Sequence, residues 1–446
     1  MMQLTQNRVA GSRIVALGML VAALMAASLL LAAGQARAVT TFYVNSTADH
    51  SDANLALGSC DTGGTVPGAG GEPENECTLR AAMEQANYTT GADIINFAIP
   101  GSDVKTIVPN TGLPTITGPL TINGYSQPGA SPNTKAVGSD AVLKIELSGA
   151  NVSDGDGLQI GASNSTVKGL VINRFGYDGI YLADSTAVGT KIEGNFIGTD
   201  PSGTQDLGND GLGVSIPFSG SNTVGGTSLA ARNLISGNAD GGVLVFSDNN
   251  QVRGNLIGTQ RDGTGPLGNE EDGVTIYGSS SIVSGNTIAF NGIDGVAVYG
   301  DVRGNRVLSN SIYNNVEEGI DLRLSFTDSG PTANDPGDGD DGPNGLQNKP
   351  VITSAKTGDR TTTINARLNS TPNKTFAIQF FSNPSGTNEG RVFVGQRSVT
   401  THASGDVTFA FTPKDKVGLG RTITATAISP GGNTSEFSAA RTVVAR

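Results

Sequence analysis

The sequence predicts an all-β protein whose central part is a solenoid of short stacked coils. Between Gly157 and Leu322 a glycine repeatedly opens a segment of alternating apolar residues, and a Gly-Asn segment follows each one. Successive opening glycines lie 22 to 32 residues apart. A unit this short has no room for a helix and cannot bury its apolar face alone, so it must stack on its neighbours. The opening glycines are Gly157, Gly179, Gly211, Gly242, Gly273, Gly295 and Gly319.

The composition agrees with narrow coils and excludes some classes of partner. Tryptophan is absent and aromatic residues make up 5% of the chain, so the core must come from Val, Ile, Leu and Ala. The net charge is −12, and it becomes −15 without residues 1–38, because 25 Lys and Arg then face 40 Asp and Glu. A surface this acidic repels nucleic acid and anionic lipid. We therefore expect neutral polymers or divalent cations as partners, and no nucleic acid.

Residues 1–38 are typical of a secretory signal peptide. Arg8 and Arg13 precede an apolar run over residues 14–33, and Ala36 and Ala38 form a small-x-small cleavage site. We expect the protein to be exported to the extracellular space or the cell surface. The run is also long enough to span a bilayer, so an uncleaved anchor is an alternative. No second apolar run follows, and we expect no membrane span after signal removal.

Residues 39–150 are predicted to hold an N-terminal cap and the first coils. Apolar residues recur at helical spacing behind Thr78, which is suited to cap a helix. We expect this helix to cover the open end of the solenoid, where backbone and apolar interior would otherwise be exposed. The two cysteines, Cys60 and Cys77, favour a disulfide that pins the helix, and two free buried thiols are the alternative. The apolar helical positions are Leu79, Ala82, Met83 and Ala86.

Two sets of motifs resemble a group of bacterial exported proteins. The segment CTLRAAMEQAN, with a cysteine upstream, looks like the N-terminal CSLREA-type segment of bacterial surface proteins. The phrases GNFIGTDPSGTQDLGNDGLGV and GNLIGTQRDGTGPLGNEEDGV look like the right-handed parallel β-helix repeats of the same group. The resemblance implies a right-handed parallel β-helix and covers nearly the whole chain after residue 38, but it brings no single established activity. Ala81 stands where the motif has Glu, so no role of that acid is carried over.

The Gly-Asn segments predict a column of buried asparagines at one corner of the solenoid. Each Asn precedes by two residues an Ile on the same strand face, so an inward Ile implies an inward Asn. Stacked amides can bond from coil to coil. We prefer this structural role to a catalytic amide row, because buried polar groups need partners. The predicted pairs are Asn195/Ile197, Asn233/Ile235, Asn255/Ile257, Asn286/Ile288 and Asn310/Ile312, with Asn305 as an alternative in the last coil.

The longer coils hold extra residues at 199–209, 227–232 and 259–270, where we expect surface loops. The first and third follow the same Ile-Gly corner, so they should project from the same side, two coils apart. Loops gathered on one side of a repeat protein often form its binding face, and tolerated decoration is an equal alternative. The residues of this predicted ligand face are Asp200, Asp206, Arg261 and Asp262.

The coils are expected over residues 151–327, and residues 328–349 read as an acidic Gly/Pro linker. Four aspartates within seven residues of this linker make an oxygen-rich loop that suits Ca²⁺. A solvated linker explains them as well, since the final Glu of an EF-hand is missing. Residues 350–446 carry evenly spaced short strands, typical of an immunoglobulin-like β-sandwich. The candidate calcium ligands are Asp335, Asp338, Asp340 and Asp341.

Acidic residues beside the opening glycines raise the question of catalysis. Their regular spacing favours turn residues, and a row that binds Ca²⁺ or substrate is the alternative. His50 and His402 lie outside the repeats, and the arginines in and around the repeats sit in no recognisable catalytic motif, so we assign no catalytic residue. The acids are Asp156, Asp178, Asp210, Asp240, Asp272, Asp294 and Glu318, and the arginines are Arg174, Arg232, Arg253, Arg261, Arg303, Arg306 and Arg323.

The sequence favours an exported, non-catalytic scaffold for display, adhesion or carbohydrate binding at the cell surface. The alternative is a polysaccharide lyase or glycoside hydrolase acting on acidic or neutral glycans, because other parallel β-helices host such enzymes. A purely structural layer component is a third hypothesis. Calcium is the only cofactor that the sequence suggests.

Overall fold

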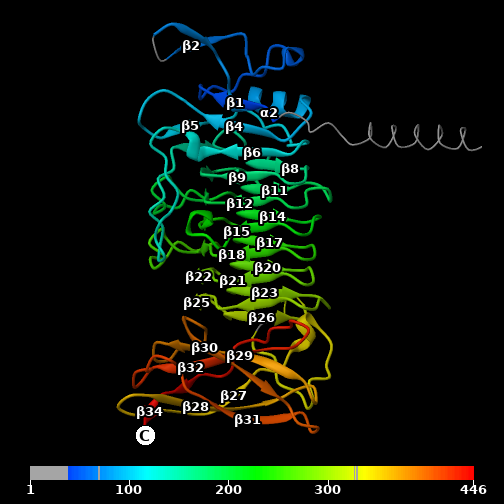
Figure 1. Cartoon of the computed structure of the whole chain (residues 1–446), viewed down its shortest axis with the longest axis vertical. Coiled ribbons are helices and arrows are strands. Elements are labelled where there is room, and N and C mark those ends of the chain that lie inside the picture. Colours follow the sequence, from blue (N-terminus) through cyan, green and yellow to red (C-terminus); the bar gives the residue numbers. More distant parts are fainter. Residues whose placement is uncertain (1–38, 69–70, 326, 328–329) are drawn as a thin grey trace, which may run out of the picture.

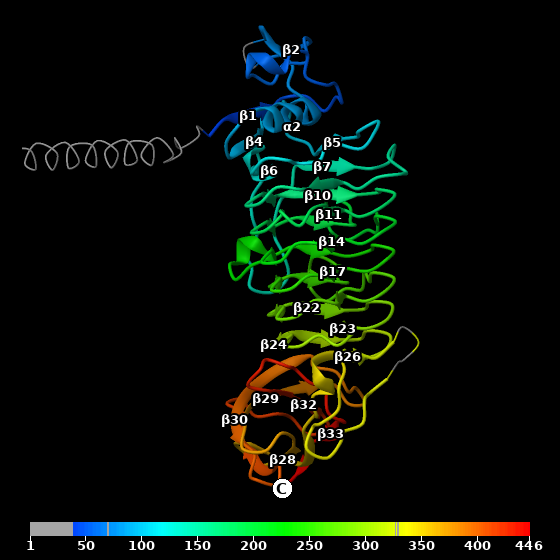
Figure 2. The same cartoon turned by 90° about the vertical axis from the view of Figure 1, so that its right-hand side faces the viewer.

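The molecule is an elongated stack of coils with a small cap at one end and a β-sandwich at the other (Figure 1). The computed structural model describes residues 39–68, 71–325, 327 and 330–446, so the predicted signal peptide lies outside it. Figure 2, turned by 90°, shows the sandwich directly below the last coils. Among the residues described, no helix is long and apolar enough to cross a membrane.

The stack is a right-handed parallel β-helix, as the resemblance implied. A complete coil contributes one strand to each of three parallel sheets, which have nine, eight and seven strands. Strands of one sheet lie over one another, so Ile180 pairs with Leu158 of the preceding coil and with Val214 of the next. Inward side chains are aliphatic, and Val243 and Val274 are each at most 1% exposed. The apolar faces of the coils therefore form one continuous core.

The nine-stranded sheet supplies a strand that the sequence analysis missed. Its strands are mostly three residues long, with one inward residue such as Val252 between the outward Gln251 and Arg253. A single buried residue cannot show a period of two, so the pattern predicts only two strands per coil. In spatial order the strands are β1 (Thr41–Val44), β4 (Asp93–Phe97), β6 (Leu120–Asn123), β9 (Thr166–Lys168), β12 (Lys191–Glu193), β15 (Thr223–Gly225), β18 (Gln251–Arg253), β21 (Ile282–Ser284) and β24 (Arg306–Leu308).

The eight-stranded sheet starts at the predicted asparagine column, which is confirmed. Nδ2 of Asn233 donates to Oδ1 of Asn255 at 2.9 Å, and Nδ2 of Asn255 donates to Oδ1 of Asn286 at 3.0 Å. Asn310 ends this column, and Asn305 belongs to another corner. In spatial order the strands are β5 (Lys105–Ile107), β7 (Ile145–Ser148), β10 (Leu170–Asn173), β13 (Phe196–Ile197), β16 (Leu234–Ile235), β19 (Leu256–Ile257), β22 (Thr287–Ala289) and β25 (Ser311–Tyr313).

The seven-stranded sheet follows the column of opening glycines, with one correction. Gly213, not Gly211, lies next to Gly179, and the prediction was wrong because DGLGV holds two glycines two residues apart. A Cβ on Gly213 would meet the carbonyl oxygen of Gly242 at 2.7 Å, so this column leaves no room for side chains. The strands are β8 (Leu158–Ile160), β11 (Ile180–Leu182), β14 (Val214–Ile216), β17 (Val243–Val245), β20 (Val274–Ile276), β23 (Val296–Tyr299) and β26 (Ile320–Arg323).

Two further columns of buried polar side chains, all amides except Ser281, line the other corners and were not predicted. Nδ2 of Asn238 donates to Oδ1 of Asn269 at 3.0 Å, and each Asn of that column stands four residues before its opening glycine. That spacing is a sequence signal, and it identifies Gly213 through Asn209. The second column is Asn209, Asn238, Asn269, Asn291 and Asn315, and the third is Asn222, Asn250, Ser281, Asn305 and Asn344.

The N-terminal cap has the predicted helix and disulfide. α2 (Leu79–Tyr88) begins behind Thr78, whose hydroxyl accepts a hydrogen bond from a backbone N–H of the first turn. Met83 on its inner side is fully buried in the same core as the coils. Cys60 and Cys77 are disulfide-bonded, so the helix is tied to the loop above it. The cap also contains η1 (Leu55–Leu57), β2 (Thr65–Pro67) and β3 (Pro73–Asn75).

Residues 350–446 form a β-sandwich of two four-stranded sheets. Neighbouring strands are antiparallel, apart from the parallel pair of β27 with β34. Phe376, Ile378 and Phe380 from one sheet and Ile364 from the other meet in a separate core. The sheets are β31 (Asp406–Phe411), β28 (Thr362–Asn369), β27 (Val351–Thr357) and β34 (Val444–Ala445), and β30 (Val392–Thr400), β29 (Thr375–Asn383), β32 (Thr422–Ile428) and β33 (Arg441–Thr442).

The sandwich and the end of the linker close the lower end of the β-helix. Leu346 of η4 (Pro343–Leu346), Phe381 and Phe437 belong to the same core as the coil interior. Glu389 accepts a hydrogen bond from Asn315 and so ends the second amide column. The linker is therefore not solvated along its whole length, because its residues 342–348 are buried and Asn344 bonds to Asn305 of the last coil.

Substitution of Asn255 tests the first amide column. We expect Asn255→Leu to lower the free energy of unfolding by about 3 kcal/mol, because the backbone N–H and Nδ2 of Asn233 lose their buried acceptor. Urea unfolding followed by circular dichroism measures the change. Asn151→Ala, at an exposed turn, is the control and should change stability by less than about 0.5 kcal/mol. A variant as stable as the parent would contradict the role of the column.

Candidate functional site

The two predicted binding loops lie on the same side of the stack, as expected. Residues 199–209 lead toward β14 and residues 259–270 lead toward β20. The backbone N–H of Arg261 in the second loop donates to the carbonyl of Gly203 in the first at 2.9 Å. The loops therefore support each other beside the N-terminal edge of the seven-stranded sheet.

The side chains of the predicted ligand face bond within the protein. Asp200, Asp206 and Asp262 accept hydrogen bonds from backbone N–H groups of their own loops, and these bonds lower the pKa of Asp262. Nε and one Nη of Arg261 donate to backbone carbonyls of residues 139 and 141 at 3.1 and 3.0 Å. A ligand would have to compete with these bonds. That the four residues contact a ligand stays a prediction.

A long connection covers the outer face of the eight-stranded sheet. Residues 124–144 begin with η2 (Gly124–Ser126) and run down the side of the coils before the chain enters β7 (Figure 1). There Ala141 and Leu143 pack in one buried cluster with Phe196 and Leu234 of the sheet. The chain itself thus occupies this face.

The outer face of the seven-stranded sheet carries a line of aromatic rings along its C-terminal edge. Phe246 stacks on Tyr277 and Tyr277 on Tyr299, with ring centroids 4.9 Å apart in both pairs. Phe246 is 54% exposed, and Phe218 of the preceding coil is 55% exposed. These rings were not predicted from the sequence, although three of them directly follow an inward residue in VLVF, VTIY and VAVY. In a chain with few aromatics this is an unusual concentration at the surface.

The N-terminal edge of the same sheet carries carboxylates, but not the continuous column that was predicted. Leu212 and Gly241 occupy the column positions of their coils, so Asp210 and Asp240 fall out of register. Burial raises the pKa of Asp178 to about 6, although its carboxylate accepts a hydrogen bond from the backbone of the next coil. Such bonds support the interpretation as turn residues, and the acids that make them are Asp156, Asp178, Asp272 and Asp294.

At the lower end of this face Arg323 lies among carboxylates. Its guanidinium contacts Asp294 at 2.8 Å, Asp321 at 3.1 Å and Glu317 at 2.7 Å. A lyase needs a basic side chain beside carboxylates where a polymer can enter. Arg323 is only 5% exposed, and Asp294 and Asp321 are fully buried. Burial and neighbouring carboxylates raise the pKa of both to about 7, so the group suits a buried junction with the linker better than a lyase site.

Three of the four predicted calcium ligands come together in the linker. Carboxylate oxygens of Asp335, Asp338 and Asp340 lie within 4.8 Å of one another, whereas Asp341 pairs with Arg303 at 2.9 Å. One oxygen of Asp335 and one of Asp340 are buried with no hydrogen-bond partner in the described part of the chain. Burial, with Asp335 nearby, raises the pKa of Asp340. A divalent cation would supply the missing partner and offset the repulsion.

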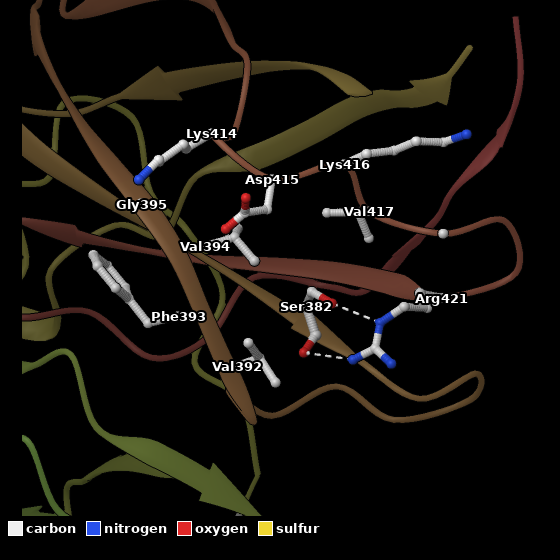
Figure 3. Close-up of a pocket in the computed structure, with 11 residues that line it drawn as sticks. Ser382, Val392, Phe393, Val394, Gly395, Lys414, Asp415, Lys416, Val417 and Arg421 are labelled. Atoms are coloured by element: carbon white, nitrogen blue, oxygen red, sulfur yellow. Dashed lines mark hydrogen bonds between the residues drawn. The ribbon is translucent and has the colours of Figure 1, made fainter. Parts of the chain in front are cut away.

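A cavity of about 510 Å³ opens on the sandwich beside β30 (Figure 3). Arg421 donates to the hydroxyl and the carbonyl of Ser382, while the side chain of Lys416 extends away from them. Lys414 and Asp415 also line the cavity, so its lining carries both signs of charge.

The sandwich as a whole is basic, with 11 Lys and Arg against 5 Asp and Glu over residues 350–446, a net charge of +6. Residues 39–349 have 14 against 35, a net charge of −21.

Residues 138–335 match the family model described as a right handed beta helix region. No curated protein matches the chain in sequence. The fold is similar to that of pectate lyase Pel9A, at 14% identity and a TM-score of 0.41, over 64% of this chain and 66% of that one. It is also similar to the A-module of the mannuronan C-5 epimerase AlgE4 of Azotobacter vinelandii, at 19% identity and a TM-score of 0.28, over 51% of this chain and 60% of that one.

Tailspike protein 2 of bacteriophage CBA120, in its enzymatically active domain, is a third similar structure. It shares 10% identity with a TM-score of 0.30, over 88% of this chain and 76% of that one. The lyase and the epimerase module are thus matched over about two thirds of their lengths or less. At such identities and TM-scores no ligand or reaction follows for this chain.

Because Asp294 and Asp321 are buried beside Arg323, we expect the free energy of unfolding to fall as pH rises. Their pKa of about 7 lies above the ordinary 3.8, so the folded protein holds these protons more tightly than the unfolded chain. The resulting stabilisation is complete below pH 3.8 and is lost as pH rises through about 7. We expect a lower melting temperature at pH 8 than at pH 5, and a smaller difference in Asp294→Asn. Thermal melting measures both.

The matched control is Asp210→Asn, which removes an exposed acid near the same sheet and should keep the pH dependence of the parent. A melting temperature that rises between pH 5 and pH 8 in the parent would contradict the assignment. So would an unchanged pH dependence in Asp294→Asn.

Proposed function

We propose that the protein is an exported, non-catalytic scaffold that binds a neutral polysaccharide along the outer face of the seven-stranded sheet. The observation that carries this proposal is the pair of exposed rings, Phe218 and Phe246, in successive coils of one face. Exposed apolar groups that cluster on a soluble surface mark interaction sites. The neighbouring coils add hydroxyl groups and carboxylates across the same sheet.

The chemistry of this face suits a sugar chain. Tyr277 covers one side of the Phe246 ring, and the exposed remainder can take the apolar face of a sugar. Across the sheet the partly exposed Asp178 and the exposed Asp240 can accept hydrogen bonds from sugar hydroxyls. The same carboxylates repel an acidic glycan, so we assign a neutral one. The loops with Asp200, Asp206, Arg261 and Asp262 border this edge and are proposed as a second contact surface.

We assign no catalysis to the seven-stranded sheet because Arg323, the arginine that lies among its carboxylates, is buried. A glycoside hydrolase is the second candidate, and Asp178 favours it. Its carboxyl is partly exposed on the glycan face, and a pKa of about 6 suits a general acid. In that case Asp178 would protonate the leaving oxygen, and a second carboxylate of the same edge would act on the sugar.

We further propose that the protein works outside the cell, either in the extracellular space or at the cell surface. The disulfide between Cys60 and Cys77 supports an oxidising compartment. The signal-like residues 1–38 and the CSLREA-type segment at residues 77–87 support export by a bacterium. The sandwich is proposed as an immunoglobulin-like contact module, whose positive charge differs from the acidic coils.

Calcium binding by Asp335, Asp338 and Asp340 is proposed as a structural role. The two buried oxygens without a partner support it. The site lies where the linker meets the sandwich, since Asp338 also accepts a hydrogen bond from the Ser370 hydroxyl. A bound cation would therefore hold the two parts together.

The glycan face is tested by removing both exposed rings. Phe218→Ala with Phe246→Ala should weaken binding of a soluble neutral β-glucan or galactomannan about tenfold, because two aromatic contacts contribute about 1–3 kcal/mol. Isothermal titration calorimetry measures the affinity. Tyr43→Ala with Tyr88→Ala removes two rings of the cap that are 59% and 58% exposed, and should leave the affinity unchanged.

Three results would contradict this assignment. Equal loss in both double variants would show that the glycan does not use this face, and tighter binding of polygalacturonate would show that it is not neutral. Release of reducing ends that Asp178→Asn abolishes would replace the scaffold with a hydrolase.

The calcium site is tested by thermal melting in 1 mM Ca²⁺ and in EDTA. A ligand at 100 times its dissociation constant stabilises a fold by about 2.7 kcal/mol, so the parent should melt at a higher temperature with calcium. Asp340→Asn should lose that difference. Asp341→Asn should keep it, because Asp341 pairs with Arg303 outside the cluster. No calcium effect in the parent would remove the proposal.

A further inference from the structure

A pocket lies on the nine-stranded sheet, away from the seven-stranded sheet that carries the proposed glycan face. The extra residues 227–232, which contain η3 (Leu229–Ala231), rise beside the outer ends of β18, β21 and β24. Together they enclose a pocket of about 360 Å³, a size within the range of small-molecule sites. Residues that line it include Ser228, Leu229, Arg232, Arg253, Ser284 and Leu308.

The pocket is a positive site in an acidic part of the chain. Its lining contains Arg232 and Arg253, and none of the described residues that line it is acidic. The guanidinium of Arg232 donates to four backbone carbonyls, of residues 135, 136, 138 and 254, at 2.6 to 3.1 Å. These carbonyls hold the group in place without neutralising its charge.

Arg253 is the more informative of the two arginines. Within the described part of the chain its guanidinium has no ion pair and donates no hydrogen bond, and its Nε is buried without an acceptor. Arg253 as a whole is half-buried. Two arginines that are buried as a whole are paired, since Arg80 contacts Asp49 and Arg323 contacts Asp294. A buried donor without a partner destabilises the fold, and an acceptor in the pocket would remove that cost.

The rest of the lining completes a site for a sugar that carries an anion. Ser284 lies directly beside Arg253 in the sheet register, and its hydroxyl can donate to the same anion. Leu229 and Leu308 offer apolar surface for the body of the ligand. Gly285 faces open space, so nothing fills the floor at that point. The pocket is thus larger than a bare inorganic anion needs.

We propose that this pocket binds a phosphorylated sugar, with the phosphate at Arg253 and Ser284. A phosphate monoester carries close to two negative charges at neutral pH, which matches two guanidinium groups that form no ion pair with the residues that the structure describes. A carboxylate or a sulfate monoester would neutralise only one. The ring of the sugar packs between Leu229 and Leu308. This site is separate from the neutral-glycan face and does not depend on it.

Titration calorimetry of the full chain with glucose 6-phosphate, glucose 6-sulfate, glucuronate, glucose and inorganic phosphate tests the proposal. We expect glucose 6-phosphate to bind most tightly, and Arg253→Gln to weaken it at least tenfold. Lys191→Gln removes one positive charge from the exposed side of β12 in the same sheet, and should change the affinity less than twofold.

Each alternative ranking overturns a named part of the proposal. Tighter binding of the sulfate or of glucuronate removes the phosphate assignment, and equal binding of inorganic phosphate removes the sugar. Equal binding of glucose, or equal loss in Arg253→Gln and Lys191→Gln, removes the site. If Arg253→Gln melts at a lower temperature than the parent, Ser284→Asp is used in its place. A carboxylate in the pocket should abolish phosphate binding while both arginines remain.

Discussion

The buried amide columns are the interaction on which the rest of the structure depends. At each corner of a coil, backbone N–H groups turn away from the sheets and need acceptors inside a dry core. Oδ1 of an asparagine in the adjacent coil accepts them, as Asn255 does for Asn233 and Asn269 does for Asn238. Because the partner within a column comes from the next coil, the columns hold the coils in register. The outer rows of rings and carboxylates inherit that register.

The sequence predicts the architecture well because the signals repeat. Alternating residues and the Gly-Asn phrase reveal two strands and one amide column in every coil, and Thr78 with the two cysteines reveals the cap. It fails where a signal is short or doubled: a strand with only Val252 inward shows no period, and DGLGV offers both Gly211 and Gly213. Both errors arise because the sequence pattern is read within one coil, whereas the pairing between coils determines which residues align.

The candidate sites were harder to predict than the fold, because side chains distant in sequence create them. Three linker aspartates meet as expected, but only the structure shows Asp341 on Arg303 instead. The rings at Phe218 and Phe246 belong to different coils, and their exposure depends on which face the chain leaves open. In the sequence Arg253 resembles any surface arginine. Only the structure shows that its buried Nε has no acceptor among the described residues. Sequence pattern predicts position along a coil, whereas function here depends on neighbours across coils.

The closed ends of the β-helix have a consequence for how such proteins change over time. A coil beyond the reach of the connection over residues 124–144 meets only the coils above and below it, while Met83 seals the top and Phe437 and Glu389 seal the bottom. Gene duplication of one internal turn would therefore lengthen the rod without any new kind of contact. Loss of a seal would instead leave an open edge prone to fibre growth. The length of the β-helix can thus change during evolution, whereas the cap and the sandwich that close its two ends must be kept.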